Sequence, residues 1–276
     1  MNDIEVIREL DCVDFTCIIQ LSLLIHQKYD IIWLIAVYIN DYISFAALGG
    51  IMVEIYAMNI NQPIDHKDYD RLFDLISEHR REQLKKIHSK HNQIRSLYGE
   101  VLARMAITSR LKIVNNDILI SYNEHGKPYL INHKGTFYNI SHSGDWVVCA
   151  IGSQEVGVDI ERIKSSNLKL AKRFFASEEY EDLIRQNESD QANYFCQLWT
   201  LKECYVKWHG GGLTIPLNSF RFQIQKDEIK FICHEKSELN FKRYDIAPDY
   251  MLTVCSKEDF FCEKIIFVDV KDLRIE

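Results

Sequence analysis

The sequence predicts an α+β protein, because a helix-rich stretch followed by short strands occurs twice along the chain. The first helix-rich stretch covers about residues 68–111, and strand-like runs follow it over 118–161. The second covers about residues 177–208, and strand-like runs follow it over 220–276. No repeat of the amino-acid sequence accompanies this order, so a duplicated architecture is suggested by the pattern alone.

The size and composition of the chain indicate a globular protein with a substantial core. It has 276 residues, of which 47% are hydrophobic and 26% charged, enough for one large domain or two half-size units. The net charge of −7 argues against a nucleic-acid partner, because affinity for a phosphate backbone depends on many Lys and Arg contacts. The eight cysteines include no C-x-x-C pair, which favours reduced thiols in a cytoplasmic protein.

The N-terminal residues 1–51 form a separate problem. The apolar run 31–53 is long enough to span a bilayer, but Asn40 and Asp41 lie near its middle, and a central Asp costs about 2.5 to 3.5 kcal/mol on insertion scales. The flanks do not fit a standard signal peptide either. We therefore expect an N-terminal extension of unknown role and no membrane partner; it is either an added helical pair or a stretch upstream of a start near Met52.

The first helix-rich stretch combines helical periodicity with basic residues. Over 78–111 the apolar residues recur three, four or seven apart, as in Leu84, Ile87, Ile94 and Leu97. Basic residues on the same stretch include Arg80 and Arg95. Such a run is equally typical of a solvated helix face.

The strand-like run VGVDIE at 156–161 predicts two carboxylates on one face. Asp159 and Glu161 share a parity opposite to the apolar residues, so a strand would place them about 6.6 Å apart on the same side. Two such oxygens suit Mg²⁺, which takes a few carboxylates and leaves room for substrate phosphate. A half-buried strand with an acidic solvent face is the alternative.

Glu203 and Lys207 lie one turn apart on the predicted helix that ends near residue 208. An exposed ion pair would have the same spacing, but Trp199 and Trp208 indicate partly apolar surroundings. In that setting the carboxylate can serve as a metal ligand and proton acceptor, and the ammonium can neutralise phosphate charge.

The segment YNISHSG at 138–144 has a hydroxyl on each side of His142. Small side chains, backbone N–H groups and an imidazole at a predicted turn between strands are suited to bind an anion. A structural histidine is the alternative. A nucleophilic Ser–His mechanism fits poorly, because Ser141 and Ser143 adjoin His142 and neither lies in a G-x-S-x-G elbow.

These pieces, in this order and spacing, resemble the 4'-phosphopantetheinyl transferase superfamily, in particular its large, monomeric, surfactin-synthetase-activating type. The resemblance extends from about residue 52 to near the C-terminus and leaves the first fifty or so residues unmatched. The stretches that carry it are GKPYL (126–130), YNISHSG (138–144), VGVDIE (156–161), RFFASEEY (173–180) and LWTLKECYVK (198–207).

The resemblance implies two similar α+β halves related by a pseudo-twofold, with coenzyme A in the cleft between them. We expect these halves at residues 52–155 and 156–276. Mg²⁺ would be held against the coenzyme A pyrophosphate by Asp159, Glu161 and Glu203.

The resemblance also implies catalytic and coenzyme A-binding residues. Glu203 would deprotonate the carrier serine, and Lys207 would stabilise phosphate charge or protonate the leaving group. His142 and Arg95 would hold the 3'-phosphate. The residues expected to bind coenzyme A are Arg80, Arg95, Gly126, Lys127, Pro128, Ser141, His142 and Lys207.

Two residues depart from the pattern of the family. Gln83 stands where the family usually has a second basic residue, so the affinity for the 3'-phosphate of coenzyme A is open. Cys204 replaces the usual small Ala or Ser after Lys-Glu, at a position that should pack and not react.

The activity that the resemblance implies is Mg²⁺-dependent transfer of 4'-phosphopantetheine from coenzyme A to a serine of an apo carrier protein, with release of 3',5'-ADP. Expected partners are carrier domains of peptide, polyketide or fatty-acid synthases. Among these, carriers of non-ribosomal peptide synthesis and antibiotic biosynthesis are favoured. A metal-dependent phosphodiester hydrolase stays open as an alternative. So does a non-catalytic protein that binds coenzyme A or a carrier, although the intact acidic residues and Lys207 argue against lost activity.

Overall fold

The computed structural model describes residues 52–61, 64–225, 228–233 and 238–273. Our expectations for residues 1–51, the apolar run included, lie outside this part of the chain. Within the described part, no helix is both long and apolar enough to cross a membrane. The six cysteines found there are free thiols.

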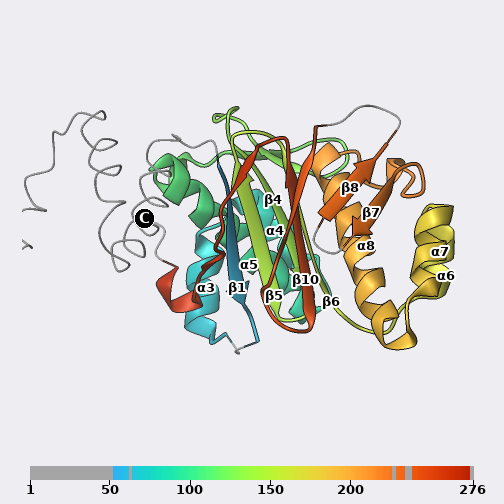
Figure 1. The fold of residues 1–276 in the computed structure, drawn as a ribbon. Coiled ribbons are helices and arrows are strands. Elements are labelled where there is room, and N and C mark those ends of the chain that lie inside the picture. Colours follow the sequence, from blue (N-terminus) through green and yellow to red (C-terminus); the bar gives the residue numbers. More distant parts are fainter. Residues whose placement is uncertain (1–51, 62–63, 226–227, 234–237, 274–276) are drawn as a thin grey trace, which may run out of the picture. The chain divides into compact units, whose positions relative to one another are not determined.

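The larger sheet has five strands, which are β1 (Met52–Asn59), β4 (Phe137–Ser143), β5 (Trp146–Gly152), β11 (Phe260–Phe261) and β12 (Ile266–Phe267). Its order is β11-β1-β5-β4, and β12 also pairs with β1 (Figure 1). β5 is antiparallel to both β1 and β4, whereas β11 and β12 run parallel to β1. The C-terminal end of the described chain therefore completes a sheet that its first strand begins.

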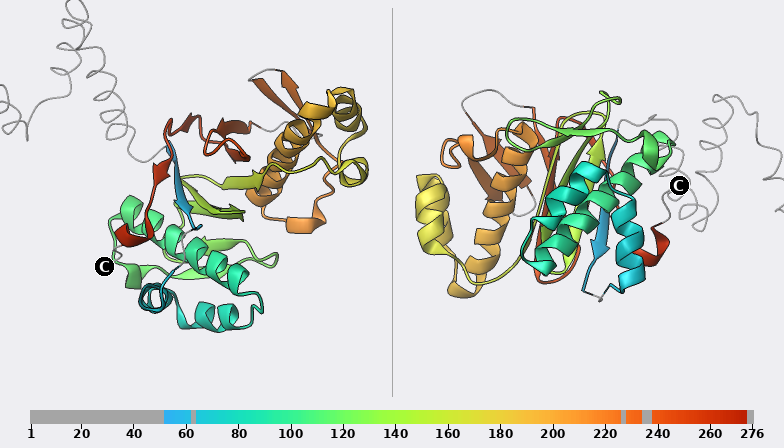
Figure 2. Two further views of the ribbon diagram at one scale, coloured as in Figure 1. Left: turned by 90° about the horizontal axis from the view of Figure 1, so that it is seen from below. Right: turned by 180° about the vertical axis from the view of Figure 1, so that it is seen from behind.

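Three helices cover one face of this sheet (Figure 2), namely α3 (His66–Asp74), α4 (Glu78–Lys85) and α5 (Lys90–Leu111). Each begins after a residue whose side chain accepts a hydrogen bond from the first turn, which satisfies a backbone donor that has no helical partner. These capping residues are Asp65, Ser77 and Ser89. The core between α5 and the sheet includes Tyr98, Leu102, Val147 and Ile151.

The smaller sheet has three antiparallel strands, which are β6 (Val156–Arg162), β10 (Tyr250–Ser256) and β9 (Asn240–Tyr244), in this order. The long helix α8 (Glu188–His209) packs on it. A Cβ atom at Gly157 would lie 2.1 Å from the carbonyl oxygen of Cys204, so only glycine permits this close approach of strand and helix.

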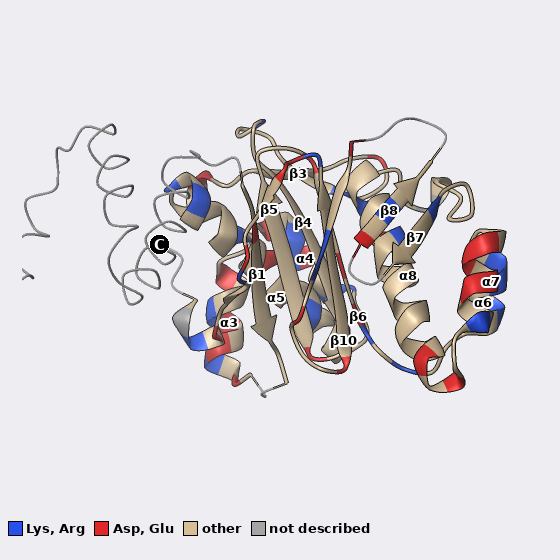
Figure 3. Ribbon diagram, viewed as in Figure 1, with Lys and Arg blue, Asp and Glu red and all other residues tan. Residues whose placement is uncertain are grey.

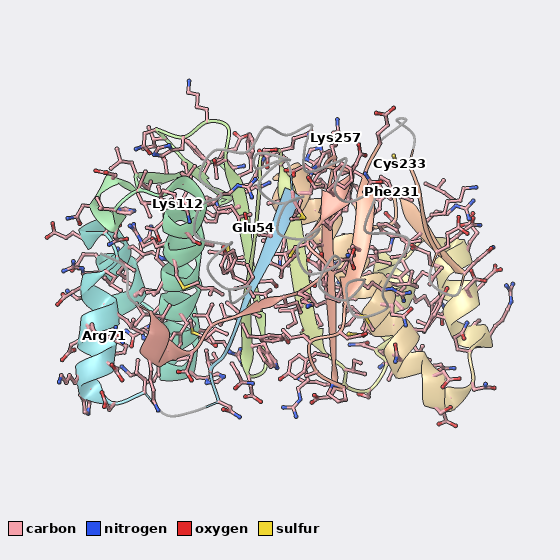
Figure 4. All side chains as sticks on the ribbon, turned by 60° about the vertical axis from the view of Figure 1, so that its left-hand side comes forward. Glu54, Arg71, Lys112, Phe231, Cys233 and Lys257 are labelled. Atoms are coloured by element: carbon pink, nitrogen blue, oxygen red, sulfur yellow. The ribbon has the colours of Figure 1, made fainter. Side chains whose placement is uncertain are left out.

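A third group of elements packs around the outer side of α8, namely α6 (Leu168–Phe174), α7 (Ser177–Arg185), β7 (Arg221–Gln225) and β8 (Glu228–Ile232). Phe231 of β8 lies in an aromatic cluster with its ring centroid 4.8 Å from that of Tyr205 and 5.1 Å from that of Phe222 (Figure 4). The charged residues of α6 are all basic, whereas α7 carries acidic residues and a single Arg in its last turn (Figure 3); this residue, Arg185, pairs with Glu181.

The two sheets share a second apolar core. Residues of β1 and β5 that point away from α5, such as Ile55 and Val148, pack with Val158 of β6 and Val254 of β10. A separate hairpin of β2 (Ile120–Tyr122) and β3 (Pro128–Leu130) contributes to the site described below. Short 3₁₀ turns complete the described chain at η2 (Asn115–Asp117), η3 (Gly212–Thr214) and η4 (Val270–Asp272).

The predicted α+β class is confirmed, with differences in detail. The periodic stretch 78–111 is two helices, because α4 ends near Lys86 and the cap at Ser89 starts α5. The division into halves at 52–155 and 156–276 stays a prediction. β11 and β12 come from the second predicted half but extend the sheet of the first.

Candidate active site

A cavity of about 600 Å³ collects side chains from α4, α5, β4, β6, α8 and the β2–β3 hairpin. Its walls contain most of the residues that the sequence singles out, which are Arg80, Gly126, Pro128, Ser141, His142, Asp159, Glu161, Glu203 and Lys207. Trp199 of α8, one turn before Glu203, also lines it. Arg95 and Lys127 are not on its walls.

Asp159 lies at the buried centre of the acidic part of the cavity. Its side chain is 4% exposed. The Lys207 ammonium lies 2.6 Å from Oδ1, and the Ser141 hydroxyl donates to the same oxygen at 2.9 Å. The other oxygen, Oδ2, is buried and has no hydrogen-bond partner among the described residues. A buried carboxylate oxygen without a donor is costly, so this atom points to a missing cation or donor.

Glu161 and Glu203 add two more carboxylates to the same cavity. Burial raises the pKa of Glu161, and the Asp159 carboxylate raises it further. The pKa of Glu203 is raised by the same two causes in the same order. Lys207 lowers both pKa values but is the smaller influence. The cavity therefore holds more negative charge than its ammonium neutralises.

The carboxylates of Asp159, Glu161 and Glu203 are chemically suited to a hard divalent cation. Their side chains do not converge on a single point in this structure. No group of three or more His, Cys, Asp and Glu side chains in the described ranges is close enough to form a metal site. The Lys207 ammonium is the partner of Asp159 Oδ1. Carboxylate oxygens, one of them orphaned, are the ligands that Mg²⁺ accepts.

His142 and Arg95 lie close together at the end of β4. Burial lowers the pKa of His142, and the Arg95 and Lys207 charges lower it further, while its own backbone raises it. Arg95 donates from Nη2 to the carbonyl of Gly144 at 2.8 Å, and its Nε is buried without a partner in the described part. Gly144 has a φ of 54° and abuts the Tyr250 hydroxyl, so the turn after β4 requires glycine.

Arg80 reaches the cavity from α4 and is held by two neighbours. Its Nη1 donates to the Gln83 side chain at 3.0 Å, and its Nε lies 3.8 Å from a Glu100 carboxylate oxygen. Glu100 in turn accepts from Arg104 Nε at 3.0 Å. Gln83 thus orients a neighbouring guanidinium in the place where a second basic residue is usual.

Sequence reasoning missed Glu100 as part of this cavity. The residue is 5% exposed and lines the wall beside Arg80. The available signal was its four-residue spacing from Arg104 on an otherwise apolar helix face, since buried charges occur almost only in pairs.

Lys127 points away from this cavity. Its ammonium bonds the carbonyl of Trp208 at 2.8 Å and contacts the Glu155 carboxylate. The residue lines a second cavity of about 410 Å³ on the other side of the hairpin. Gly126, with a φ of 84°, and Pro128 do face the first cavity. The expectation that Lys127 binds coenzyme A stays a prediction with no contact to support it.

Comparison with known proteins gives matches over nearly the whole described chain. Residues 62–154 match the model of the 4'-phosphopantetheinyl transferase N-terminal family, and residues 155–255 match that of the 4'-phosphopantetheinyl transferase superfamily. The 4'-phosphopantetheinyl transferase Sfp of Bacillus subtilis (strain 168) is 35% identical over 80% of this chain and all of its own length. The 4'-phosphopantetheinyl transferase gsp of Aneurinibacillus migulanus is 34% identical over 74% of this chain and 86% of its own length.

Proposed function

The chain belongs to the 4'-phosphopantetheinyl transferase superfamily, and we propose that it moves the 4'-phosphopantetheine group of coenzyme A onto a serine of an apo carrier protein. The observation that carries the proposal is the convergence of Asp159, Glu161, Glu203 and Lys207 on one cavity. All four lie within the part of the chain that matches the superfamily.

Glu203 is suited to act as the general base. Its raised pKa, caused by burial and by Asp159, makes it a better proton acceptor than an exposed carboxylate. It would take the proton of the carrier serine as that oxygen attacks the β-phosphorus of coenzyme A. The bond from this phosphorus to the bridging oxygen then breaks, and 3',5'-ADP leaves.

Lys207 is suited to stabilise the phosphates or to give a proton to the leaving oxygen. Its ammonium already lies in the cavity, on Asp159 and Ser141. A phosphate oxygen that enters the cavity offers it a third partner, because an ammonium has three donors. Charge placed in advance in a partly buried site needs little rearrangement as the reaction proceeds.

The 3'-phosphate end of coenzyme A would lie beside Arg80 and His142, with Ser141 deeper in the cavity. A neutral His142 can donate one N–H to a phosphate oxygen. Arg95 would support this end through the Gly144 carbonyl that it holds, and Gly126 and Pro128 would line the nucleotide.

Mg²⁺ would be held by Asp159, Glu161 and Glu203 once these side chains close around it. When bound, it would offset negative charge on the pyrophosphate. The orphaned Asp159 Oδ2 and the excess of carboxylate charge support this assignment.

The finer parts of the function rest on the family alone. We propose carrier domains of peptide, polyketide or fatty-acid synthases as partners, with non-ribosomal peptide and antibiotic biosynthesis as the first setting to examine. A monomeric enzyme that works in the cytoplasm is part of the same proposal.

The decisive variant is Asp159→Ala, incubated with coenzyme A, Mg²⁺ and an apo carrier domain. Wild type should add one phosphopantetheine arm to the carrier, seen by mass spectrometry of the intact protein. The variant should lose at least about 100-fold in rate and keep a cooperative thermal transition.

Normal labelling by folded Asp159→Ala would refute the metal assignment. Two outcomes with wild type would refute the transferase. Cleavage of coenzyme A without a carrier adduct would favour a phosphodiester hydrolase, and binding of coenzyme A without any product would favour a non-catalytic protein.

A further inference from the structure

β4 and β6 are joined by side chains in place of a backbone ladder. They belong to different sheets and are not paired as neighbours in either one. Three side chains of β4 nevertheless accept hydrogen bonds from three backbone N–H groups of β6. The pairs are Asn139 Oδ1 with Val158 N at 3.0 Å, Ser141 Oγ with Ile160 N at 3.3 Å, and Ser143 Oγ with Arg162 N at 3.1 Å.

The spacing of these contacts is regular. Each acceptor lies 19 residues before its donor, so the two strands run parallel and in register. In a strand, every second side chain points to one side, and the backbone groups repeat with the same period. Asn139, Ser141 and Ser143 therefore match the row of N–H groups that β6, at the edge of its own sheet, presents toward β4.

This arrangement solves a physical problem for β6. Its residues 156–160 are buried, and a buried N–H group without an acceptor costs about as much as a lost hydrogen bond. Short polar side chains supply the acceptors and keep the two backbones farther apart than a ladder would. We call this set of contacts the β4–β6 zipper.

The zipper also reaches the acidic residues of the cavity. A serine oxygen that accepts one hydrogen bond still has its own proton to donate. Ser141 donates to Asp159 Oδ1 at 2.9 Å, and Ser143 donates to Glu161 Oε2 at 2.7 Å. In both cases the acceptor lies 18 residues after the serine. The same register thus satisfies the edge of β6 and fixes two carboxylates.

We propose that the β4–β6 zipper positions the carboxylates of β6 for a divalent cation, and that Ser143 is a positioning residue that acts through Glu161. This inference rests on the proposed function. Ser143 is not on the wall of the cavity, whereas Glu161 is, so the hydroxyl works on the carboxylate and not on a ligand.

Ser143 matters because Glu161 has little else to orient it. Its side chain is half-buried at the end of β6, and the Ser143 hydroxyl is its one hydrogen-bond donor in the described part. Loss of a group that orients a metal ligand commonly weakens metal binding by about 10- to 100-fold.

The test compares Ser143→Ala with Ser143→Thr in the full chain. Mn²⁺ binding in the presence of coenzyme A is measured by electron paramagnetic resonance, which reads the metal without turnover. We expect Ser143→Ala to weaken Mn²⁺ binding by at least about 10-fold. Threonine keeps the hydroxyl and suits a strand, so Ser143→Thr should stay within about threefold of wild type.

Ser153→Ala is the matched control. Ser153 Oγ also donates to a buried carboxylate, Glu258 Oε1, at 3.2 Å, but away from the cavity. This variant should bind Mn²⁺ as wild type does. A role of Ser143 in stability alone would lower the melting temperature and leave Mn²⁺ affinity unchanged, which would overturn the proposal.

A double-mutant cycle with Glu161→Gln tests the route of the effect. In that background Ser143→Ala should weaken Mn²⁺ binding no further, because the two residues act as one unit. Three results would each contradict the zipper assignment. They are an additive loss of Mn²⁺ affinity in the double variant, an unchanged Mn²⁺ affinity in Ser143→Ala, and a Mn²⁺ affinity of Ser143→Thr as low as that of Ser143→Ala. So would a wild-type chain with no affinity for Mn²⁺.

These failures are separable from failure of the proposed function. If wild type labels an apo carrier and Ser143→Ala binds Mn²⁺ normally, only the zipper assignment is wrong. If wild type labels no carrier, the transferase proposal fails whatever the Mn²⁺ measurements give.

Discussion

Two lysines five residues apart on α8 have opposite surroundings. The Lys202 side chain is fully buried, and its ammonium has three oxygen partners, which are the Glu179 carboxylate at 2.7 Å and the carbonyls of Leu217 at 2.8 Å and Phe220 at 2.9 Å. The Lys207 side chain is 27% exposed and faces a cavity in which Asp159 keeps an orphaned oxygen.

The difference separates a closed network from an open one. At Lys202 every donor is used, and the rings of Phe175 and Phe220 cover the ammonium, so no ligand can enter. At Lys207 the charges do not balance within the described residues, and the cavity leaves space for what would balance them. A closed buried pair holds a helix in place, whereas an open one is suited to bind and react.

The largest effect on stability is expected from Lys202→Met. It leaves the Glu179 carboxylate, whose side chain is 1% exposed, without its cation, which typically costs about 3 to 5 kcal/mol. The free energy of unfolding in urea measures this. Lys85→Met is the control, since its pair with Glu82 is 59% exposed on both sides and should contribute less than about 1 kcal/mol. Equal losses in the two variants would remove the contrast.

Lys207→Met should reverse the pattern seen at Lys202. We expect carrier labelling to slow by about 100-fold, since charge stabilisation in the reaction is lost. Stability should fall as well, because Asp159 is 4% exposed and would keep only the Ser141 bond, but by less than in Lys202→Met, since Lys207 is 27% exposed whereas Lys202 is fully buried. A variant that unfolds like Lys202→Met but still labels its carrier would show that Lys207 is structural.

A smaller effect is expected from pH. The pKa of Glu203 is raised above its ordinary 4.5, first by burial and then by Asp159. A base must be ionised, so the labelling rate should rise with pH through this raised pKa and then level off. The rate profile of wild type measures the midpoint, which should lie above 4.5. Glu203→Gln should lose most of the rate together with this limb, and a limb that persists in it would assign the titration elsewhere.

Local spacing explains which parts of the site could be predicted. Asp159 and Glu161 are two residues apart on a strand, and Glu203 and Lys207 are four apart on a helix. Each spacing fixes a shared direction whatever the tertiary fold. Local spacing does not show that the strand with Asp159 and Glu161 lies beside the helix with Glu203 and Lys207. The resemblance to the family implied this.

The rest depends on contacts between distant parts of the chain. The sequence places Ser143 beside His142 but does not connect it with Glu161, so its role emerges only when β4 lies in register with β6. Lys127 adjoins two residues that do line the cavity, yet it turns to Trp208 because α8 ends there. β11 and β12 are two residues long, too short for alternation to reveal them.

Chelation tests the central claim, that the carboxylates of this cavity work by holding a divalent cation. Full-length wild type, coenzyme A and an apo carrier are mixed with excess chelator, and Mg²⁺ is then restored in steps while the carrier is followed by intact mass. We predict no labelled carrier before Mg²⁺ is added and full labelling after it. Complete labelling in excess chelator would contradict the account.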